Sequence, residues 1–241
     1  MASILGVSTS CMIGLDKTLN EKIDFIKSLG VEGIELFGQD LLKYGINDTT
    51  RKLLDSFEYK SIHMPVGKPS YGKEGEGFEV LEKIKAFATE LDVNTLVFHP
   101  LQIENYSIFG KEKFSYGVEN MPDGKKKIGY QTVEDMKKIL SKNQNLELVF
   151  DACHALANNI KRSDFLELED KMCEVHISAT DEMGKNADHR LLSKSPRNII
   201  EKLEPILAID KPIIIEIESL LGNINEMKTE IKFVKKLAKR F

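Results

Sequence analysis

The chain has 241 residues and a mass of 27.3 kDa, with 41% hydrophobic and 30% charged residues, values that are ordinary for one globular unit. Its 34 basic and 38 acidic side chains give a net charge of −4, which argues against a general polyanion-binding surface. No apolar run approaches the about 20 residues of a membrane span, and the first ten residues lack the pattern of a signal peptide. The three cysteines, Cys11, Cys153 and Cys173, show no CxxC spacing, so we expect reduced thiols in a cytoplasmic protein with no membrane partner.

Short apolar, β-branched runs recur along the chain at intervals of roughly 30 residues, the length of one βα unit. There are eight such runs, at residues 4–7, 33–37, 60–64, 95–99, 116–119, 146–151, 173–178 and 212–217. Several are apolar almost throughout, which favours parallel strands buried on both faces.

Segments with helical periodicity lie between most of these strands. The pair Thr18 and Glu21 predicts a capping box, followed by an apolar stripe that ends at Gly30. Ser195 before Pro196 predicts another helix start, with the serine as the cap. Including the helix that starts at Pro196, the other helices are expected at residues 78–91, 132–140, 196–203 and 224–241.

The repeated alternation of strand and helix predicts an α/β protein with a parallel sheet. Eight such units close most naturally into one TIM (β/α)8 barrel, and we expect residues 1–241 to form this single domain. The segment between His99 and Tyr116 is too short and too interrupted for a long outer helix, so the fourth crossover is expected to be shortened.

The chemically important residues are concentrated at one end of the predicted barrel, where TIM-barrel active sites lie. The five histidines and three acids all fall at or just beyond strand ends: His63, His99, Glu119, Asp151, His154, His176, His189 and Glu216. Acids inside apolar strands are costly unless they are paired or bound to metal. Imidazole plus carboxylate is the ligand set of ions such as Zn²⁺ and Mn²⁺, so the pattern predicts a divalent-metal site. Glu218 has the parity of Glu216 and either faces the barrel interior as a second acid or faces solvent at the rim.

These motifs resemble those of the xylose-isomerase-like TIM barrels, a superfamily of sugar isomerases, sugar epimerases and endonuclease IV (AP endonuclease family 2). The resemblance covers most of the chain. It rests on HP after the fourth strand, EN after the fifth, DACHA at residues 151–155, VHIS in the seventh strand and Glu216 in the eighth. DACHA is the most specific motif and is especially like endonuclease IV.

For the nuclease branch, the resemblance implies three ions. His63 and His99 would bind the first, with Glu119 bridging to the second. The remaining ligands would be Asp151, His176 and Glu216 for the second ion, and His154 and His189 for the third. Ala187 stands where endonuclease IV has an aspartate, and Asp188 is adjacent in a different register.

For the epimerase branch, the resemblance implies a single ion held by Glu119, Asp151, His176 and Glu216. Glu119 and Glu216 would also shuttle the proton, and His154 would touch the substrate. The implied cofactor is therefore one to three divalent ions, zinc or manganese.

We favour a sugar or sugar-phosphate isomerase or epimerase, in which a proton moves next to a metal-polarised carbonyl. The partner would be a small sugar substrate, and the lysines at residues 125–127 either meet a phosphate or form a solvated loop.

The alternative is a zinc-dependent phosphodiesterase acting at abasic sites in DNA. The histidine pattern favours it, but arginine is scarce, and a chain this short leaves little material for gripping a duplex. Under this alternative, Tyr71 and Phe109 are the only obvious loop aromatics near the right face that could wedge into a duplex. A barrel that keeps its metal only as a structural staple is the third hypothesis, and the oligomeric state stays open.

Overall fold

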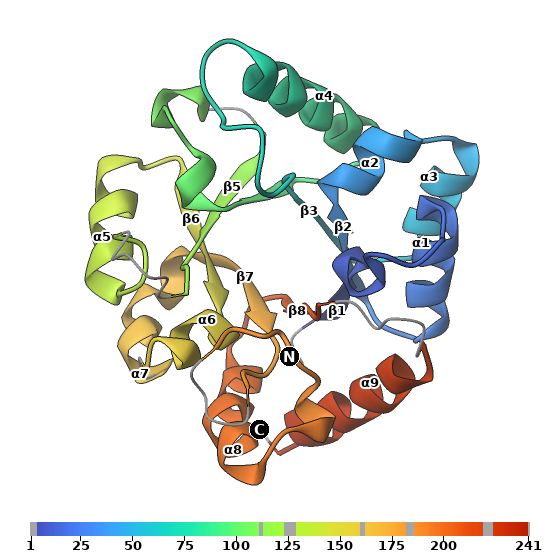
Figure 1. Cartoon of the computed structure of the whole chain (residues 1–241), viewed down its shortest axis with the longest axis vertical. Coiled ribbons are helices and arrows are strands. Elements are labelled where there is room, and N and C mark those ends of the chain that lie inside the picture. Colours follow the sequence, from blue (N-terminus) through green and yellow to red (C-terminus); the bar gives the residue numbers. More distant parts are fainter. Residues whose placement is uncertain are drawn as a thin grey trace.

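The structure is a computed structural model that describes residues 4–110, 113–122, 129–159, 162–181, 186–218 and 224–240. Eight parallel strands form a closed barrel in chain order, with β8 paired to β1 (Figure 1). The strands are β1 (Leu5–Ser8), β2 (Gly33–Phe37), β3 (Tyr59–His63), β4 (Thr95–Phe98), β5 (Ser115–Glu119), β6 (Leu146–Asp151), β7 (Met172–Ile177) and β8 (Ile213–Ile215). The predicted TIM-barrel class is confirmed.

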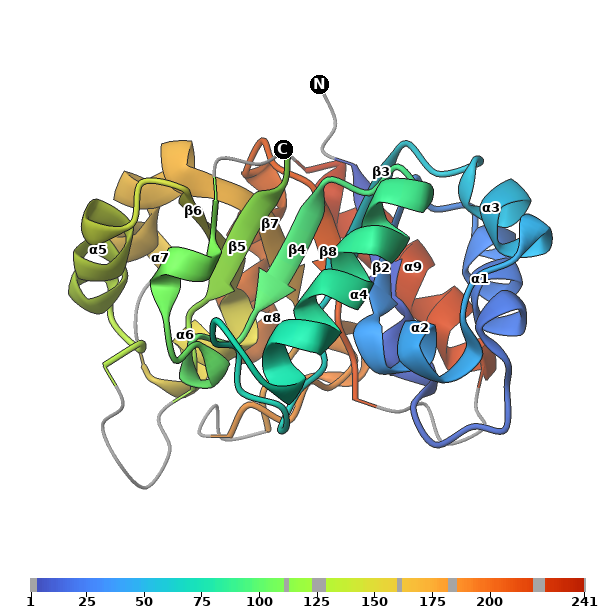
Figure 2. The same cartoon turned by 90° about the horizontal axis from the view of Figure 1, so that it is seen from above.

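Helices surround the barrel on all sides (Figures 1 and 2). The α-helices are α1 (Leu19–Ser28), α2 (Gly38–Tyr44), α3 (Asp48–Leu54), α4 (Glu76–Glu90), α5 (Val133–Lys142), α6 (Ala152–Ala157), α7 (Arg162–Phe165), α8 (Arg197–Leu203) and α9 (Ile224–Ala238). Short 3₁₀ helices are η1 (Thr9–Met12), η2 (Pro100–Gln102), η3 (Tyr106–Ile108), η4 (Leu166–Lys171), η5 (Leu192–Lys194) and η6 (Glu204–Ala208). The periodicity did not predict α2, α3, α6 and α7, which are too short to carry a clear apolar stripe. Among the described helices, none combines the length and apolar character needed to cross a bilayer.

Two predicted helix starts have different outcomes. The capping box at α1 is confirmed, because the Thr18 hydroxyl accepts from the Glu21 N–H while the Glu21 carboxylate accepts from the Thr18 N–H. The predicted Ser195 cap of α8 is wrong. The N-cap residue is Pro196, and the Ser195 hydroxyl donates to the Leu191 carbonyl at 2.8 Å, so it is already engaged by the preceding turn.

The described part of the β4–β5 connection contains η2 and η3 and covers the barrel with aromatic side chains. Phe109 is buried, with its ring centroid 5.1 Å from that of Phe98 and 5.0 Å from that of Tyr116. Tyr71, from the β3–α4 loop, packs on Phe98 from another side at 5.4 Å. Residues 111–112 lie outside the described residues, so the shortened crossover stays a prediction.

Alternate strand residues line the barrel interior, and both glycines and buried polar side chains occur among them. Gly6, Gly33 and Gly117 lie where neighbouring strands approach closely. Other lining positions hold buried polar side chains, among them Glu35, Ser61 and Glu174. The interior is therefore unusually polar below the strand ends, where most barrels carry branched apolar residues.

Gly6→Ala tests how tightly this interior is packed. A methyl group at position 6 would approach the Gly33 backbone carbon to 2.8 Å and collide with the Ile214 side chain. We expect a loss of about 1–3 kcal/mol in the free energy of unfolding, measured by urea denaturation. Gly72→Ala is the control, because its nearest neighbour is the flexible Glu104 carboxylate at 3.2 Å. Equal unfolding midpoints for the two variants would contradict the prediction.

Candidate metal centre

The eight residues predicted as ligands converge at the carboxyl end of the barrel. They form three groups whose possible ligand atoms lie within 4.8 Å of one another: His63, His99 and Glu119; Glu119, Asp151, His176 and Glu216; and Asp151, His154 and His189. Glu119 and Asp151 each belong to two groups, so the groups adjoin one another. The convergence follows from the fold, because parallel strands bring their carboxyl ends to one edge.

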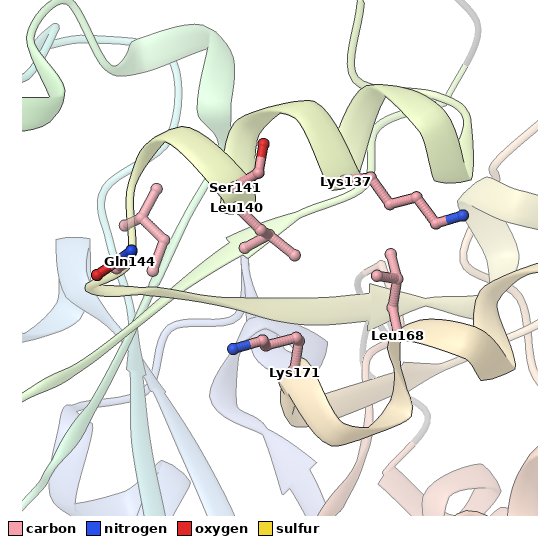
Figure 3. A pocket seen from close by; sticks show the side chains of 7 residues that line it. Lys137, Leu140, Ser141, Gln144, Leu168 and Lys171 are labelled. Atoms are coloured by element: carbon pink, nitrogen blue, oxygen red, sulfur yellow. The ribbon is translucent and has the colours of Figure 1, made fainter.

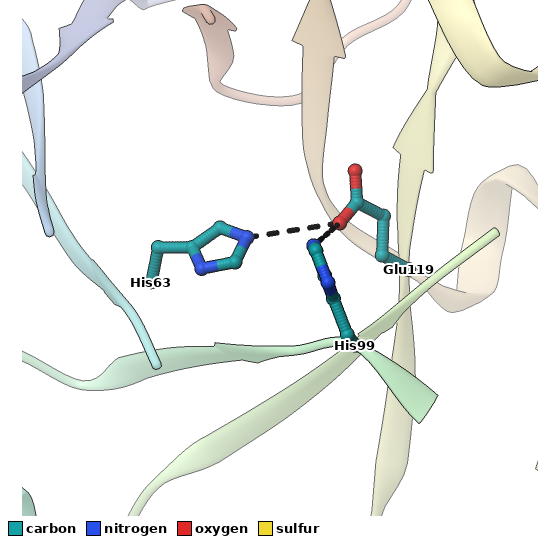
Figure 4. Close-up of side chains that lie close together, drawn as sticks. All are labelled: His63, His99 and Glu119. Atoms are coloured by element: carbon teal, nitrogen blue, oxygen red, sulfur yellow. Dashed lines mark ion pairs between the residues drawn. The ribbon is translucent and has the colours of Figure 1, made fainter. Parts of the chain in front are cut away.

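The first group comes from β3, β5 and the residue after β4 (Figure 4). The Glu119 Oε2 atom lies 3.1 Å from His99 Nε2 and 3.7 Å from His63 Nε2. His63 Nδ1 lies 2.9 Å from the Met64 carbonyl, which makes Nδ1 the donor and leaves the Nε2 lone pair facing Glu119. A second ring nitrogen fixed by a carbonyl is typical of metal-binding histidines.

The second group is centred on His176 in β7. Its Nδ1 atom lies 3.4 Å from Glu119 Oε1 and 3.0 Å from Glu216 Oε2. Asp151, at the end of β6, completes the group and accepts from the His154 N–H at the start of α6. Three carboxylates therefore surround one imidazole nitrogen.

The third group joins α6 to the loop after β7. The Nε2 atoms of His154 and His189 lie 3.0 Å apart, and His154 Nδ1 lies 2.8 Å from the Asn120 carbonyl. His189 adopts a left-handed φ of 43°, and an antiparallel bridge between Ala179 and Arg190 holds its loop. Two imidazole nitrogens that face each other at this distance are well placed to share one cation.

Orphaned buried atoms test whether these residues fit a cation. Within the part of the chain that the structure describes, five atoms at the centre are buried without a hydrogen-bond partner, namely His63 Nε2, Glu119 Oε1 and Oε2, Asp151 Oδ2 and His176 Nδ1. Each unsatisfied buried polar atom is costly. Ligand atoms about 2.0–2.1 Å from a tetrahedral ion lie about 3.3–3.4 Å apart, close to the separations described above. The donor set therefore fits divalent metal.

Charge complementarity shifts the proton equilibria of the centre. Burial opposes ionisation of Glu119, but the four surrounding imidazoles hold its pKa well below the usual range. Burial likewise opposes protonation of His63, but Glu119, Glu35 and Glu216 raise its pKa to about 9. For Asp151, burial dominates and raises the pKa. In the absence of metal, protons on the imidazoles partly balance the buried carboxylates.

The ligands differ in how far solvent reaches them. The Glu119 side chain is 1% exposed and Asp151 is fully buried, whereas His99 is 25%, Glu216 16% and His189 11% exposed. The centre is thus closed toward the barrel interior and open to solvent at His99, Glu216 and His189. A small molecule reaching the centre would meet them first.

Some candidates lie elsewhere. Glu218 is exposed, which resolves the two alternatives in favour of the rim. Asp188 pairs with Arg190 at 2.8 Å rather than joining a ligand group. The expected wedge role of Tyr71 and Phe109 is wrong, because both are buried in the aromatic cluster. The lysines at 125–127 lie outside the described residues.

Sequence reasoning missed two buried carboxylates. Glu35 in β2 and Glu174 in β7 are both fully buried and form a fourth group with His176. The signal was present, because each is an acid inside an apolar strand, and Glu174 has the parity of His176. The sequence alone did not indicate that Glu35 meets them across the barrel.

A cavity of about 570 Å³ lies away from this centre (Figure 3). It is on the outer surface between α5 and η4, and its lining includes Leu146, the first residue of β6. It therefore belongs to the amino end of that strand. Lys137 at its edge is paired with Glu134 and Glu167, so we assign this cavity no part in the metal centre.

Comparison with known proteins identifies the fold. No protein-family model and no curated protein sequence matches the chain. Among solved structures, a D-tagatose 3-epimerase-like protein superposes with a TM-score of 0.69 at 20% identity, covering 97% of this chain and 98% of that one. A xylose isomerase domain protein from Alicyclobacillus acidocaldarius gives 0.69 at 12% identity, with 98% of each chain covered. The TTHB071 protein from Thermus thermophilus, described as soaked with ZnCl₂, gives 0.67 at 19% identity, covering 100% and 99%. The fold is that of the xylose-isomerase-like TIM barrels.

The metal-free protein should lose stability as the pH rises. A His63 pKa of about 9, against 6.5 in an unfolded chain, gives a contribution that is complete below pH 6.5 and is lost as the pH approaches 9. A metal ion needs deprotonated imidazoles, so stabilisation by added Mn²⁺ should grow across the same range. Thermal unfolding with chelator and with Mn²⁺ at several pH values measures both trends. A metal-free melting temperature that stays flat or rises over this range would contradict the prediction.

Proposed function

We propose that the chain is a divalent-metal-dependent isomerase or epimerase of a small sugar or sugar phosphate. The observation that carries the proposal is the group of Glu119, Asp151, His176 and Glu216. In the described structure, Glu119 Oε1 and Oε2, Asp151 Oδ2 and His176 Nδ1 lack hydrogen-bond partners. One carboxylate of the group, Glu216, reaches the open side of the centre. A site whose metal-binding side chains are mostly buried, with one carboxylate accessible from outside, suits proton transfer on a bound small molecule.

A divalent ion held by this group would polarise a carbonyl and the hydroxyl on the neighbouring carbon. The hydrogen on that hydroxyl-bearing carbon would become more acidic. Glu216 is placed to remove that proton and to return it. Its ionised form is favoured, because burial is outweighed by His176 and His189, which lower its pKa. His99, 25% exposed at the open side, is placed to contact substrate oxygens. Both ring nitrogens of His189 already have partners, the Ser178 hydroxyl and His154 Nε2, each at 3.0 Å.

The two glutamates are not equally suited to carry a proton. Glu119 is enclosed by His63, His99 and His154 as well as His176, so its carboxylate has no open approach. Glu216 therefore carries the proton in our proposal, and Glu119 serves as the bridging ligand. A single carboxylate suffices for isomerisation, in which the proton moves between adjacent carbons on one face of the sugar. Epimerisation would need a second acid on the opposite face, so this arrangement favours the isomerase reaction.

The similarity to a D-tagatose 3-epimerase-like structure supports the choice of substrate class. The burial of Tyr71 and Phe109 also supports a small substrate over a duplex, because it removes the side chains expected to enter DNA.

Solvent hydrogen exchange tests the reaction. In D₂O, the Mn²⁺-loaded protein should introduce deuterium into D-tagatose or another member of a panel of ketoses and ketose phosphates. Glu216→Gln should lower the exchange rate by about 10²–10⁴-fold, even at Mn²⁺ concentrations that restore metal content. Glu201→Gln is the control, since Glu201 lies on the exposed face of α8 and pairs with Arg197. Exchange by Glu216→Gln at the rate of the original protein would overturn the assigned role.

The second candidate is a metal-dependent phosphodiesterase acting at abasic DNA. The observation in its favour is that two further histidine groups adjoin the group centred on His176, one sharing Glu119 and the other Asp151. Carboxylates shared in this way could bridge several ions. Incubation of the zinc-loaded protein with duplex DNA containing an abasic site tests it. Strand cleavage that Asp151→Ala abolishes would replace our first proposal, and intact DNA would leave the isomerase or epimerase as the function.

A further inference from the structure

His176 meets acids through both of its ring nitrogens. Nδ1 faces Glu119 and Glu216 in the metal centre, as described above. On the other side, Nε2 lies 2.7 Å from Glu174 Oε1 and 3.3 Å from Glu35 Oε2. Both Glu35 and Glu174 are fully buried. The imidazole thus links the metal centre to the acids deeper in the barrel.

The distances on the two sides indicate different occupants. At 2.7 Å, Nε2 and the Glu174 oxygen are at the separation of a charge-assisted hydrogen bond. In the described structure Nδ1 has no hydrogen-bond partner, and two oxygens lie 3.0 Å and 3.4 Å from it, near the about 3.3–3.4 Å that separates two ligands of one tetrahedral ion. A proton therefore belongs on Nε2, and the lone pair of Nδ1 is left for metal.

We propose that Glu174 is a positioning residue that commits His176 to the metal centre by accepting the Nε2 hydrogen. This inference rests on the proposed metal-dependent function. A carboxylate behind a metal-binding histidine fixes the orientation of the ring and makes its other nitrogen a better ligand. Glu174 touches neither the open side of the centre nor any of its other ligands in the described contacts, so it acts through His176.

The backbone places Glu174 for this purpose. The register between β6 and β7 shifts so that Leu148 pairs with Met172 and Val149 with Glu174, which leaves Cys173 as an extra residue. A bulge of this kind re-aims the side chains that follow it. From that point Glu174 and His176 are two residues apart on one strand and share a face, so the strand holds both against each other.

Glu35 has a different position in the same group. Its nearer oxygen is 3.3 Å from Nε2, and neither of its carboxylate oxygens has a hydrogen-bond partner in the described structure. Because Nε2 carries only one hydrogen, the shorter contact with Glu174 takes it. The two buried acids can therefore be distinguished by substitution.

Metal affinity measures the role of Glu174. We expect Glu174→Gln to weaken Mn²⁺ binding by about 10- to 100-fold, while the melting temperature of the metal-free protein stays the same or rises. Glu35→Gln should weaken binding less than Glu174→Gln does. Glu147→Gln is the matched control, because Glu147 also lies in a barrel strand but bonds to Ser115 rather than to His176. A merely structural role for Glu174 would lower the metal-free melting temperature and leave the affinity unchanged.

Nitrogen NMR supplies a second readout that folding defects do not imitate. With only five histidines in the chain, ¹⁵N-histidine spectra of the zinc-loaded protein can be assigned through single substitutions. His176 should carry its hydrogen on Nε2, and Glu174→Gln should reduce that form.

The outcomes separate this inference from the proposed function. A protein that binds no metal at all would overturn both. Tight metal binding by Glu174→Gln, an Nδ1 hydrogen on His176, or a larger loss from Glu35→Gln would overturn the role of Glu174 alone.

Discussion

The central constraint on this barrel is the burial of carboxylates. Glu119, Asp151, Glu35 and Glu174 lie at or near zero exposure inside a parallel sheet, where an isolated charge is very costly. Imidazoles meet this cost in part, since His63, His99, His154 and His176 all approach Glu119. The remaining orphaned atoms face the centre of the cluster. The negative charge of the buried carboxylates is therefore balanced only when protons or metal ions lie among these side chains. For this reason we propose that the site is a metal centre.

The fold serves this requirement at each level. Glycines in the barrel lining let neighbouring strands approach closely, with Ile214 packed against Gly6 and Val149 against Gly117. Backbone carbonyls outside the cluster, those of Met64 and Asn120, take one ring hydrogen each from His63 and His154. Those two histidines therefore present their other nitrogens to the centre. Residues just beyond the strand ends thus decide which atoms of the cluster are available as ligands.

The sequence predicted much of this because the relevant information is periodic. Repeated apolar runs predict parallel strands, and residues at the ends of parallel strands must meet, so the ligands His63, His99, Asp151 and Glu216 could be proposed without coordinates.

Contacts could not be predicted where a side chain has several nearby groups to bond or pack against. Ser195 resembles a helix cap, but its hydroxyl bonds to the turn before it. The burial of Tyr71 and Phe109 depends on how two loops fold over β4, and no local pattern encodes that. Glu35 and Glu174 were visible as acids in apolar strands, but their relation to His176 requires the barrel to be closed.

Shared ligands connect the two candidate functions physically. Glu119 belongs to the first and second ligand groups, and Asp151 belongs to the second and third. An ion in the second group would draw these carboxylates toward itself and leave the outer groups chiefly with their histidine pairs.

Neutral imidazoles alone bind hard ions such as Mn²⁺ poorly but retain affinity for Zn²⁺. Under our proposal, the same side chains would favour a single-ion centre with manganese and a fuller cluster with zinc. In our proposal, a single ion would leave His99 without a metal to bind and able to contact a sugar beside Glu216, whereas a full cluster would occupy His99 and His189 as ligands. In our proposal, occupancy of the outer groups would therefore decide whether a small polyol can be recognised at the open side, and proton transfer by Glu216 would belong to the single-ion form.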